Sequence, residues 1–519
     1  MNGILLGVLA YIALQFAVAI WVSRRIKTES DYILGGRQIG LSLAAFSVFA
    51  TWFGAETVLG SAGRVYSDGL SGAQGEPFAY AVGIVIMGLF FAVPLWRGGL
   101  VTFGDLFRER FSPGVERLTV ILLVPGSVLW AAAQIRGFGQ IMGTTTGMSV
   151  SASIALAAAI VVLYTAAGGL LADIYSDFVQ GIAIIVGLVA MFVVILVELG
   201  GPAQALASIE AARFAPMKSG QTLLDFVEQW AIPICGSLVA VELISRVLAC
   251  KSADVARTAT WIGGVGYLLV ALIPVFFGLV GQQLAPGLGE AEQIVPTLAQ
   301  KYLPPILFVM FAGALISAIL STVDSALLAA ASLVSHNIVL RMKPGMSETA
   351  KVASARIGVA VLGLVAYALA VRAEGISALV ELASAFATAG IFVALVFGLF
   401  TGWGGALSAY AAITAGALVW ACGKFALDLQ APYVCGVLAA LLAYVLVTIA
   451  ARFVAAERRA QAYHFGHDQL ADRPHWSSRQ RSICRREHDR AQRAAAMCLD
   501  PIDIPLSSAD LRLIDVASQ

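Results

Sequence analysis

The chain has 519 residues, of which 59% are hydrophobic and 13% are charged, and its formal net charge is +1. Soluble domains carry about 25% charged residues, so this composition excludes a soluble protein, and the balanced charge argues against a nucleic-acid partner. Apolar stretches of about 20 residues, the length that crosses the hydrocarbon core as a helix, recur through most of the chain. We therefore expect an all-α polytopic membrane protein embedded in the lipid bilayer.

The apolar stretches predict about thirteen membrane-spanning helices followed by a tail. The ninth stretch is longer than one crossing needs, so we expect it to tilt or to continue into a helix at the membrane surface. In chain order, the predicted spans are 3–23, 41–63, 76–96, 116–140, 149–169, 175–199, 228–247, 257–281, 304–338, 353–372, 376–400, 404–424 and 433–455.

Basic residues gather in alternate loops, which predicts the orientation of the spans. Arg24, Arg25 and Lys27 follow the first span, and Arg341 and Lys343 follow the ninth, whereas the loops on the opposite side hold fewer basic residues. Short loops rich in lysine and arginine stay in the cytoplasm. We therefore expect a multi-pass protein of the cell (inner) membrane, with its N-terminus outside and its C-terminus in the cytoplasm.

The composition changes after the last span, in residues 458–519. This segment is rich in arginine, shows little apolar periodicity and holds four of the five histidines. Such a composition predicts a basic, disordered cytoplasmic tail. His464 and His467, or Cys484 and His488, have spacings that a metal site can use, but nothing in the sequence fixes their geometry. We predict no metal site in the tail.

The second span combines glycines and a carboxylate at membrane depth. Gly54, Gly60 and Gly63 surround Glu56 in this span. Glycines lower the cost of unwinding a helix, and unwound carbonyls can coordinate a cation. Close helix packing through small residues is the alternative, and it explains the glycines but not the carboxylate. We therefore expect an interrupted helix and a binding site here, because ionisable residues inside membrane spans mark ion or substrate paths.

The ninth span carries a cluster of oxygen-bearing side chains. Ser321, Thr322, Asp324 and Ser325 fall within five positions of an otherwise apolar run. Hard oxygen ligands of this kind suit Na⁺ and do not suit a soft metal. Alternatively, the hydroxyls donate hydrogen bonds to backbone carbonyls one turn earlier. This explains single residues better than four neighbouring ones.

Two further spans contain acidic residues that need an explanation. Asp173 and Asp177 lie at the predicted start of span 6. We expect Asp173 to cap the helix, whereas Asp177 fits a helix cap and a functional site equally well. In span 7, Pro233 and Gly236 precede Glu242 and predict a second interrupted helix. We expect Glu242 to neutralise a neighbouring base or to face a watery cavity.

Four segments, in order along the chain, resemble the sodium/solute symporter family, which includes carriers of proline, sugars, pantothenate, monocarboxylates and choline. Each segment is a weak signal alone, but four in order with this span count form a specific pattern. The resemblance extends from about Gly3 to Arg459. The segments are Asp31-Tyr-Ile-Leu-Gly-Gly-Arg37, Gly168-Gly-Leu-Leu-Ala-Asp-Ile-Tyr-Ser-Asp177-Phe-Val-Gln180, Ser245-Arg-Val-Leu-Ala-Cys-Lys-Ser252 and Ser321-Thr-Val-Asp-Ser325.

This resemblance implies a LeuT-like fold with a five-plus-five inverted repeat. Spans 2–6 in residues 41–200 would form the first repeat, and spans 7–11 in residues 201–400 the second. The first span with its loop (1–40) and spans 12 and 13 (401–457) would flank them. Interrupted helices at matching places in two repeats indicate a binding site at the midplane of the membrane.

The resemblance also implies a sodium site between spans 2 and 9. Asp177 matches a family carboxylate implicated in sodium coupling, and we expect Asp324 to tune the local field. The implied ligands are the backbone carbonyls of Ala50, Phe53 and Ala318 and the hydroxyls of Ser321 and Thr322.

The resemblance therefore implies a secondary active transporter that couples Na⁺ to a small organic solute by alternating access, with no other cofactor. A solute-sensing receptor with the same fold is the alternative. An enzyme is disfavoured, because no nucleophile–base pair or metal cluster stands out, and nothing in the sequence identifies a protein partner. Residues expected at the substrate cavity are Thr51, Trp52, Glu56, Gln134 and Glu242.

The substrate itself does not follow from the resemblance, because Trp52 and Glu56 differ from the residues of several family members. These two side chains are four positions apart and share a helix face. An aromatic ring beside a carboxylate favours a positively charged solute such as an amine. Alternatively, Glu56 pairs with a base such as Arg136, or is protonated, and touches no ligand.

Overall fold

Helices account for most of the chain in the computed structural model, which describes residues 17, 24, 26–373 and 375–471. No β-strand forms in these residues beyond a single bridge between Ile39 and Cys250. The α-helices are α2 (Glu29–Leu34), α3 (Leu41–Trp52), α4 (Ser61–Asp68), α5 (Tyr80–Ile86), α6 (Ala92–Arg97), α7 (Phe103–Arg110), α8 (Pro113–Thr146), α9 (Val150–Glu198), α10 (Pro202–Ala207), α11 (Leu223–Val239), α12 (Val241–Ala249), α13 (Ala253–Leu284), α14 (Ile294–Tyr302), α15 (Pro305–Leu333), α16 (Leu340–Met342), α17 (Glu348–Arg372), α18 (Ile376–Ala385), α19 (Thr388–Phe400), α20 (Ala406–Phe425) and α21 (Pro432–Ala471).

Short 3₁₀ or π turns connect several of these helices. They are η1 (Gly35–Arg37), η2 (Glu56–Gly60), η3 (Gly69–Ala73), η4 (Gln74–Ala79), η5 (Met87–Phe91), η6 (Ala211–Phe214), η7 (Ala291–Gln293) and η8 (Val334–Val339).

The helices confirm an all-α membrane protein. Within the described residues, eight helices are long and apolar enough to cross a membrane, or up to ten when each bent pair counts as one span. Every predicted span from 41–63 onward lies on a helix or on a bent pair, whereas span 3–23 lies almost wholly outside the described residues. The total of thirteen and the inverted repeat stay predictions.

The predicted interruption of the second span is present at Phe53 and Gly54. Helix α3 ends at Trp52, and Phe53 leaves the helical conformation with φ −97° and ψ 64°. The chain becomes helical again through η2 and α4. A Cβ atom at Gly54 would lie 2.4 Å from Gln134 Oε1 and 2.9 Å from Thr322 Oγ1, so a larger residue would force these side chains to shift.

The second interruption lies between α11 and α12, at Ala240. This residue has φ −65° and ψ 118°, and the two helices are bent by 41°. Pro233 and Gly236, which led us to expect an interruption, lie inside α11 instead. The other bent pair, α18 and α19, turns by 43° and had no clear signal in the sequence.

The predicted spans 149–169 and 175–199 lie on α9, which consists of two helical segments that meet at a kink at Gly169. The kink residue has φ 60° and ψ −177°. A Cβ atom there would lie 2.7 Å from the ring of Tyr32, so glycine provides both the backbone conformation and the space. Asp173 and Asp177 follow the kink on the second half of α9.

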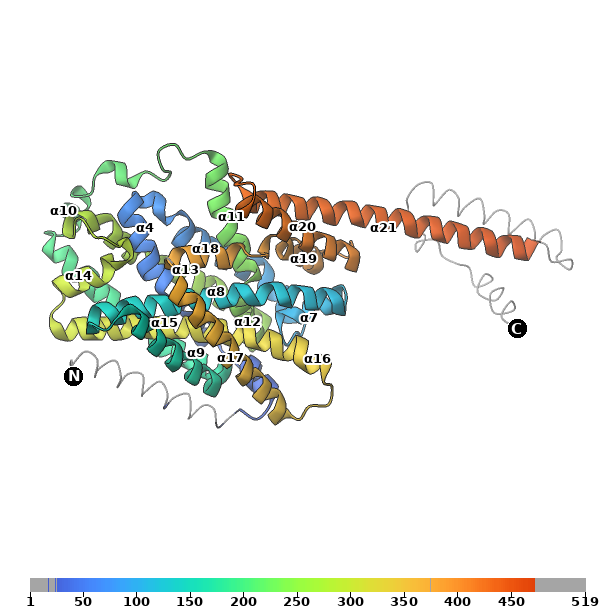
Figure 1. Cartoon of the computed structure of the whole chain (residues 1–519), viewed down its shortest axis with the longest axis horizontal. Helices are drawn as coiled ribbons and strands as arrows, with labels where there is room; N and C mark the ends of the chain where they lie inside the picture. Colours follow the sequence, from blue (N-terminus) through green and yellow to red (C-terminus); the bar gives the residue numbers. More distant parts are fainter. Residues whose placement is uncertain (1–16, 18–23, 25, 374, 472–519) are drawn as a thin grey trace. The chain divides into compact units, whose positions relative to one another are not determined.

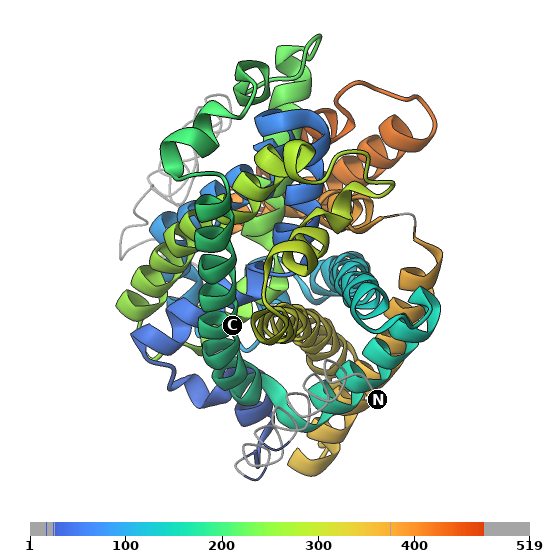
Figure 2. The same ribbon diagram turned by 90° about the vertical axis from the view of Figure 1, so that its left-hand side faces the viewer.

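Helix α15 lies at the centre of the packing. It packs against α8, α9 and α17, and Figure 2 shows it nearly end-on among its neighbours. Figure 1 places α10 and α14 at one end of the long helices and α7 and α16 at the other. Helix α15 continues through η8 into α16, which agrees with the extended ninth span. The first break and α15 can therefore face each other inside the protein.

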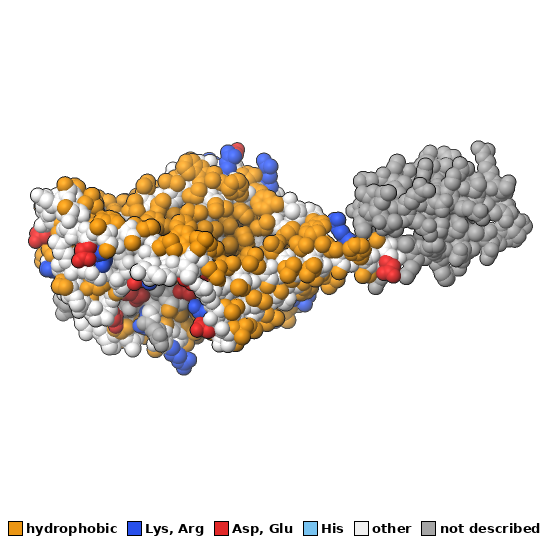
Figure 3. Space-filling view, turned by 90° about the horizontal axis from the view of Figure 1, so that it is seen from above, with side chains coloured by type: hydrophobic (Ala, Val, Ile, Leu, Met, Phe, Trp, Pro, Cys, Tyr) orange, Lys and Arg blue, Asp and Glu red, His pale blue; other side chains and the backbone are white. Residues whose placement is uncertain are grey.

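The outer surface carries many large apolar side chains. Figure 3 shows hydrophobic side chains spread over the face in view, with few charged ones among them. Leu89, Phe90, Ile121 and Leu163, for example, are more than half exposed. Such a surface is unsuited to water and matches contact with lipid tails.

Helix α21 runs from Pro432 to Ala471. Residues 458–471, which the composition assigns to a disordered tail, are therefore helical. The rest of the predicted tail, with Cys484 and His488, lies outside the described residues.

Candidate functional site

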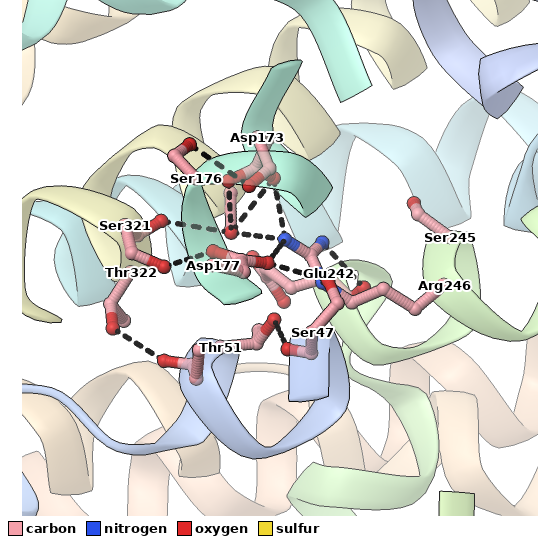
Figure 4. A network of polar contacts seen from close by, with 12 residues as sticks. Ser47, Thr51, Asp173, Ser176, Asp177, Glu242, Ser245, Arg246, Ser321 and Thr322 are labelled. Carbon is pink, nitrogen blue, oxygen red and sulfur yellow. Dashed lines mark hydrogen bonds and ion pairs between the residues drawn. The ribbon is translucent and has the colours of Figure 1, made fainter. Parts of the chain in front are cut away.

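A buried arginine, Arg246 of α12, anchors a polar network at membrane depth (Figure 4). Its side chain is 1% exposed. Its Nη2 atom lies 2.5 Å from Asp173 Oδ2 and 3.5 Å from Asp177 Oδ2, both on α9. Removing a charge from water costs several kcal/mol unless it is paired and hydrogen-bonded, so these groups depend on one another.

Serine hydroxyls from two other helices complete this network. Ser47 of α3 donates to Asp177 Oδ2 at 2.5 Å and accepts from Arg246 Nε at 3.2 Å. Ser325 of α15 donates to Asp173 Oδ2 at 3.0 Å, and Ser321 of α15 donates to Asp177 Oδ1. The network therefore joins α3, α9, α12 and α15 at one point.

The structure corrects the role expected for Asp173. Its carboxylate forms an ion pair with Arg246 and accepts a hydrogen bond from Ser325, so it does not act as the helix cap that its place in the sequence predicts. Asp177 lies in the same network, one turn along α9. Asp324 is also buried and lies near Thr165, and among the described residues it makes no ion pair with Arg246.

The predicted sodium ligands lie where the first break meets α15. Thr322 Oγ1 lies 3.3 Å from the Ala50 carbonyl oxygen and 3.2 Å from the Ala318 carbonyl oxygen. Phe53 is the residue at which α3 stops, and the neighbouring Gly54 approaches Thr322 closely. Ser321 is adjacent to Thr322 and reaches Asp177. The helix break therefore gathers carbonyl and hydroxyl oxygens, which are the hard ligands that suit Na⁺.

A cavity opens beside the second break and adjoins the end of α3. Three of the residues expected at a substrate cavity, Thr51, Trp52 and Glu242, line it. Its other lining residues are Leu123, Gly126, Ser127, Trp130, Gly236, Val239, Ala240, Val241, Ala383, Ser384, Phe386 and Thr388.

Three aromatic rings pack together at this cavity. The centroid of Trp52 lies 5.1 Å from those of Trp130 and Tyr80, and Tyr80 and Trp130 are 5.8 Å apart. The Tyr80 hydroxyl lies 2.5 Å from Ser384 Oγ, so this ring is held in place. Aromatic faces and edges arranged in this way offer an apolar surface with negative potential over the rings.

Two of the residues that line the cavity carry a polar atom that lacks a partner in the protein. Glu242 Oε1 and Trp52 Nε1 are buried and have no hydrogen-bond partner. Buried polar groups are nearly always paired, so unpaired atoms at a cavity wall point to a ligand or water. Among the described residues that line the cavity, Glu242 carries the charge and no lysine or arginine is present.

The other two residues expected at the cavity, Glu56 and Gln134, do not line it. Gln134 Nε2 donates to Glu56 Oε2, and Gln134 Oε1 accepts from the Ala55 amide at 2.7 Å. Arg136, the alternative partner for Glu56, donates instead to the Ala370 carbonyl at 3.4 Å. Glu56 therefore contacts an amide side chain next to the first break.

Several residues of the site had only a weak signal in the sequence. Arg246 was part of a family-like segment, and a base inside an apolar span was the signal that it has acidic partners. Trp130 and Tyr80 lie on spans rich in apolar residues, where an aromatic ring is ordinary. Only the fold brings these rings to Trp52.

Comparisons with known proteins agree with this arrangement. The model of the sodium:solute symporter family matches residues 32–416. The high affinity choline transporter 1 of Homo sapiens is 30% identical over 423 residues, which cover 76% of this chain and 72% of that protein. The sodium/pantothenate symporter of Haemophilus influenzae is 26% identical, with 67% and 75% covered.

Solved structures show the same fold. A Na⁺-coupled sialic acid symporter in a substrate-bound outward-open state matches with a TM-score of 0.76 at 18% identity, covering 86% of this chain and 97% of that one. A nucleobase-cation-symport-1 family transporter in a closed conformation matches with a TM-score of 0.58, also at 18% identity, covering 82% and 94%. The sequence relatives named above are transporters, which supports symport over a receptor or an enzyme. The chain thus belongs to the sodium:solute symporter family, as a multi-pass membrane transporter that couples a small organic solute to Na⁺.

Proposed function

We propose that this transporter carries a small organic cation, of the quaternary ammonium or amine class, in the cavity beside the second break. The observation that supports this most directly is the combination of Glu242 with the rings of Trp52 and Trp130 on the cavity wall. A desolvated cation over an aromatic face gains about 2 kcal/mol. The Glu242 carboxylate, whose Oε1 has no hydrogen-bond partner in the protein, supplies the opposite charge.

The charge of the cavity also discriminates between the substrates of the relatives. Choline is a cation, whereas pantothenate is a carboxylate, and both classes of transporter resemble this chain. An anion beside Glu242 would be repelled, and no described lining residue is basic. The cavity therefore favours choline or a similar cation over pantothenate.

The sodium ion in this proposal binds at the first break. Its ligands are the carbonyls of Ala50, Phe53 and Ala318 and the hydroxyls of Ser321 and Thr322. Asp177 supplies negative charge through Ser321, and Asp324 tunes the local field. Because Trp52 lines the cavity and Phe53 follows it directly, the residues proposed to bind Na⁺ and solute share one helix end.

We further propose that the protein lies in the cell (inner) membrane with α10 and α14 outside and α7 and α16 in the cytoplasm. The distribution of basic loop residues supports this orientation. A cysteine at the exposed position Ser219, in a variant without native cysteines, should react with a membrane-impermeant reagent added outside. A cysteine at the exposed position Lys343 should not react, and the reverse pattern would overturn the orientation.

Two interrupted spans at the beginning of residues 41–200 and 201–400 support the inverted repeat. In this arrangement α3 with α4 corresponds to α11 with α12, and both breaks lie near the membrane midplane.

Uptake into proteoliposomes tests the substrate proposal. An inward Na⁺ gradient should drive accumulation of labelled choline but not of labelled pantothenate, and replacing Na⁺ with K⁺ should abolish it. Glu242→Gln should lower the apparent affinity for choline by about tenfold or more, because it removes a buried countercharge. The exposed control Glu210→Gln should transport normally. Uptake of pantothenate, or unchanged choline affinity in Glu242→Gln, would refute the cationic substrate.

A further inference from the structure

A second pair of carboxylates lies buried behind the first break, outside the network of Arg246 and outside the cavity. Glu56 of η2 is 1% exposed and Glu76 of η4 is fully buried. Within the described residues, neither makes an ion pair, and each has one carboxylate oxygen without a hydrogen-bond partner, Glu56 Oε1 and Glu76 Oε2. Two ionised carboxylates without a countercharge are costly in such a place, so at least one needs a bound cation or a proton.

The hydrogen bonds around Glu76 indicate whether this carboxylate needs a proton or a bound cation. Thr57 Oγ1 lies 2.7 Å from Glu76 Oε1 and 2.9 Å from the Trp52 carbonyl. Both of these oxygens are acceptors when Glu76 is ionised, but a threonine hydroxyl has a single hydrogen to donate. Tyr267 also contacts Glu76 Oε1, with its own single hydrogen.

A proton on Glu76 Oε1 satisfies every one of these contacts. Glu76 then donates to Thr57, Thr57 donates to the Trp52 carbonyl, and Tyr267 donates to Glu76. An ionised Glu76 would compete with the Trp52 carbonyl for the hydrogen of Thr57. A metal ion would need several free oxygens, whereas this pair offers Glu56 Oε1 and Glu76 Oε2, and the described residues hold no group of three or more His, Cys, Asp or Glu side chains that could bind a metal.

The other charged or titratable groups facing Glu76 come from four elements. Glu56 on η2 adds negative charge, and Tyr80 on α5 and Tyr267 on α13 are phenols. Arg64 on α4 contributes positive potential, but it lies beyond ion-pair distance of Glu76. The surroundings therefore offer no partner that replaces a proton.

We propose that Glu76 binds a proton in this conformation, in a buried site that is separate from the predicted sodium site. The hydrogen-bonded chain from Glu76 through Thr57 ends at the carbonyl of Trp52, where α3 stops. The bound proton consequently stabilises the helix end that lines the cavity and precedes Phe53. Loss of the proton at high pH removes a hydrogen bond from this chain and adds a buried negative charge near Glu56.

Infrared difference spectroscopy of the purified transporter in lipid tests this inference without any need for substrate or Na⁺. The parental minus Glu76→Gln spectrum at neutral pH should contain the C=O stretching band of a protonated buried carboxyl. The same difference taken with the exposed control Glu210→Gln should lack this band. Glutamine keeps a donor for Thr57, so Glu76→Gln mimics the protonated state and should retain the fold.

A second variant, Thr57→Val, keeps the inference testable if Glu76→Gln is unstable. Thr57→Val removes the acceptor of the proposed hydrogen bond, so the same carboxyl band should shift in frequency without disappearing. Sodium-driven uptake by Glu76→Gln should also lose the decline at high pH that we expect of the parental protein. A Glu76→Gln spectrum that superimposes on the parental spectrum, or a band unmoved in Thr57→Val, would overturn the proton site whatever the transported solute proves to be.

Discussion

Both broken spans contain an interruption of the helical backbone, but the two interruptions serve different functions. In the first, α3 stops at Trp52 and the chain turns through Phe53 and Gly54, and in the second, α11 and α12 meet at Ala240. Each break frees backbone groups at membrane depth, where they need partners from the protein or from a ligand. The neighbouring side chains then decide what the break can bind.

At the first break most of those neighbours are carbonyl, hydroxyl and amide groups. Thr322 already contacts the Ala50 carbonyl, Asp177 acts through a serine hydroxyl, and Gln134 contacts the Glu56 carboxylate beside Gly54. At the second break the neighbours are a carboxylate and aromatic rings, which suit a larger and softer cation. A broken helix thus marks a site, while the facing helices determine whether the site fits an ion or an organic solute.

The largest expected effect comes from Arg246, because it links the two breaks. It lies on α12 six residues after Ala240 and contacts Ser47 on α3. Arg246→Met should destabilise the protein by about 3–5 kcal/mol, because it leaves buried carboxylates without their partner. The measurement is the thermal unfolding temperature of the purified protein.

The double variant Arg246→Met with Asp173→Asn is the control for this prediction, because it also removes one of the stranded charges. It should recover part of the lost stability. A double variant that is less stable than Arg246→Met would show that the ion pair is not the source of the effect.

A smaller effect is expected for Trp130 at the second break. Trp130→Leu keeps an apolar side chain but removes the ring, so the half-saturating concentration of choline should rise by about 2–30-fold, the equivalent of 0.5–2 kcal/mol. The half-saturating Na⁺ concentration should stay the same. Equal changes in both values would mean that the two breaks do not bind separate ligands.

The smallest effect on substrate affinity is expected for Glu56. Its pairing with Gln134 keeps it off the cavity wall, and a glutamine can preserve a hydrogen bond there. Glu56→Gln should therefore change the half-saturating choline concentration by less than about fivefold, or 1 kcal/mol. A loss of choline affinity as large as that expected for Glu242→Gln would show that Glu56 belongs to the substrate site.

Much of this architecture could be predicted from the sequence, because apolar length and glycine placement are local signals. The break in the second span and the hydroxyl pair of Ser321 and Thr322 are read directly from residue types in an apolar run. The break at Ala240 is harder, because its residue has no special backbone preference and the nearby Pro233 is accommodated within α11.

The partners of buried side chains could not be predicted, because they depend on how helices pack. Glu56 and Trp52 share a helix face in an ideal helix, but the break and the π turn rotate Glu56 away from the cavity and toward Gln134. Asp173 has the sequence position of a cap, yet the kink at Gly169 places it opposite Arg246. In both cases the local sequence pattern identified a polar residue inside the membrane, but it did not indicate which way the side chain points.

The central claim, that Na⁺ binds at the first break and the solute at the second, is tested most directly by a matched pair of threonine variants. Thr322→Ala removes a proposed sodium ligand, whereas Thr388→Ala removes a hydroxyl that lines the cavity and likewise bonds to a carbonyl one turn earlier. Sodium titrations of choline uptake should show a rise in the half-saturating Na⁺ concentration of about tenfold for Thr322→Ala and no change for Thr388→Ala. Parental sodium dependence in Thr322→Ala, or an equal shift in both variants, would contradict the account.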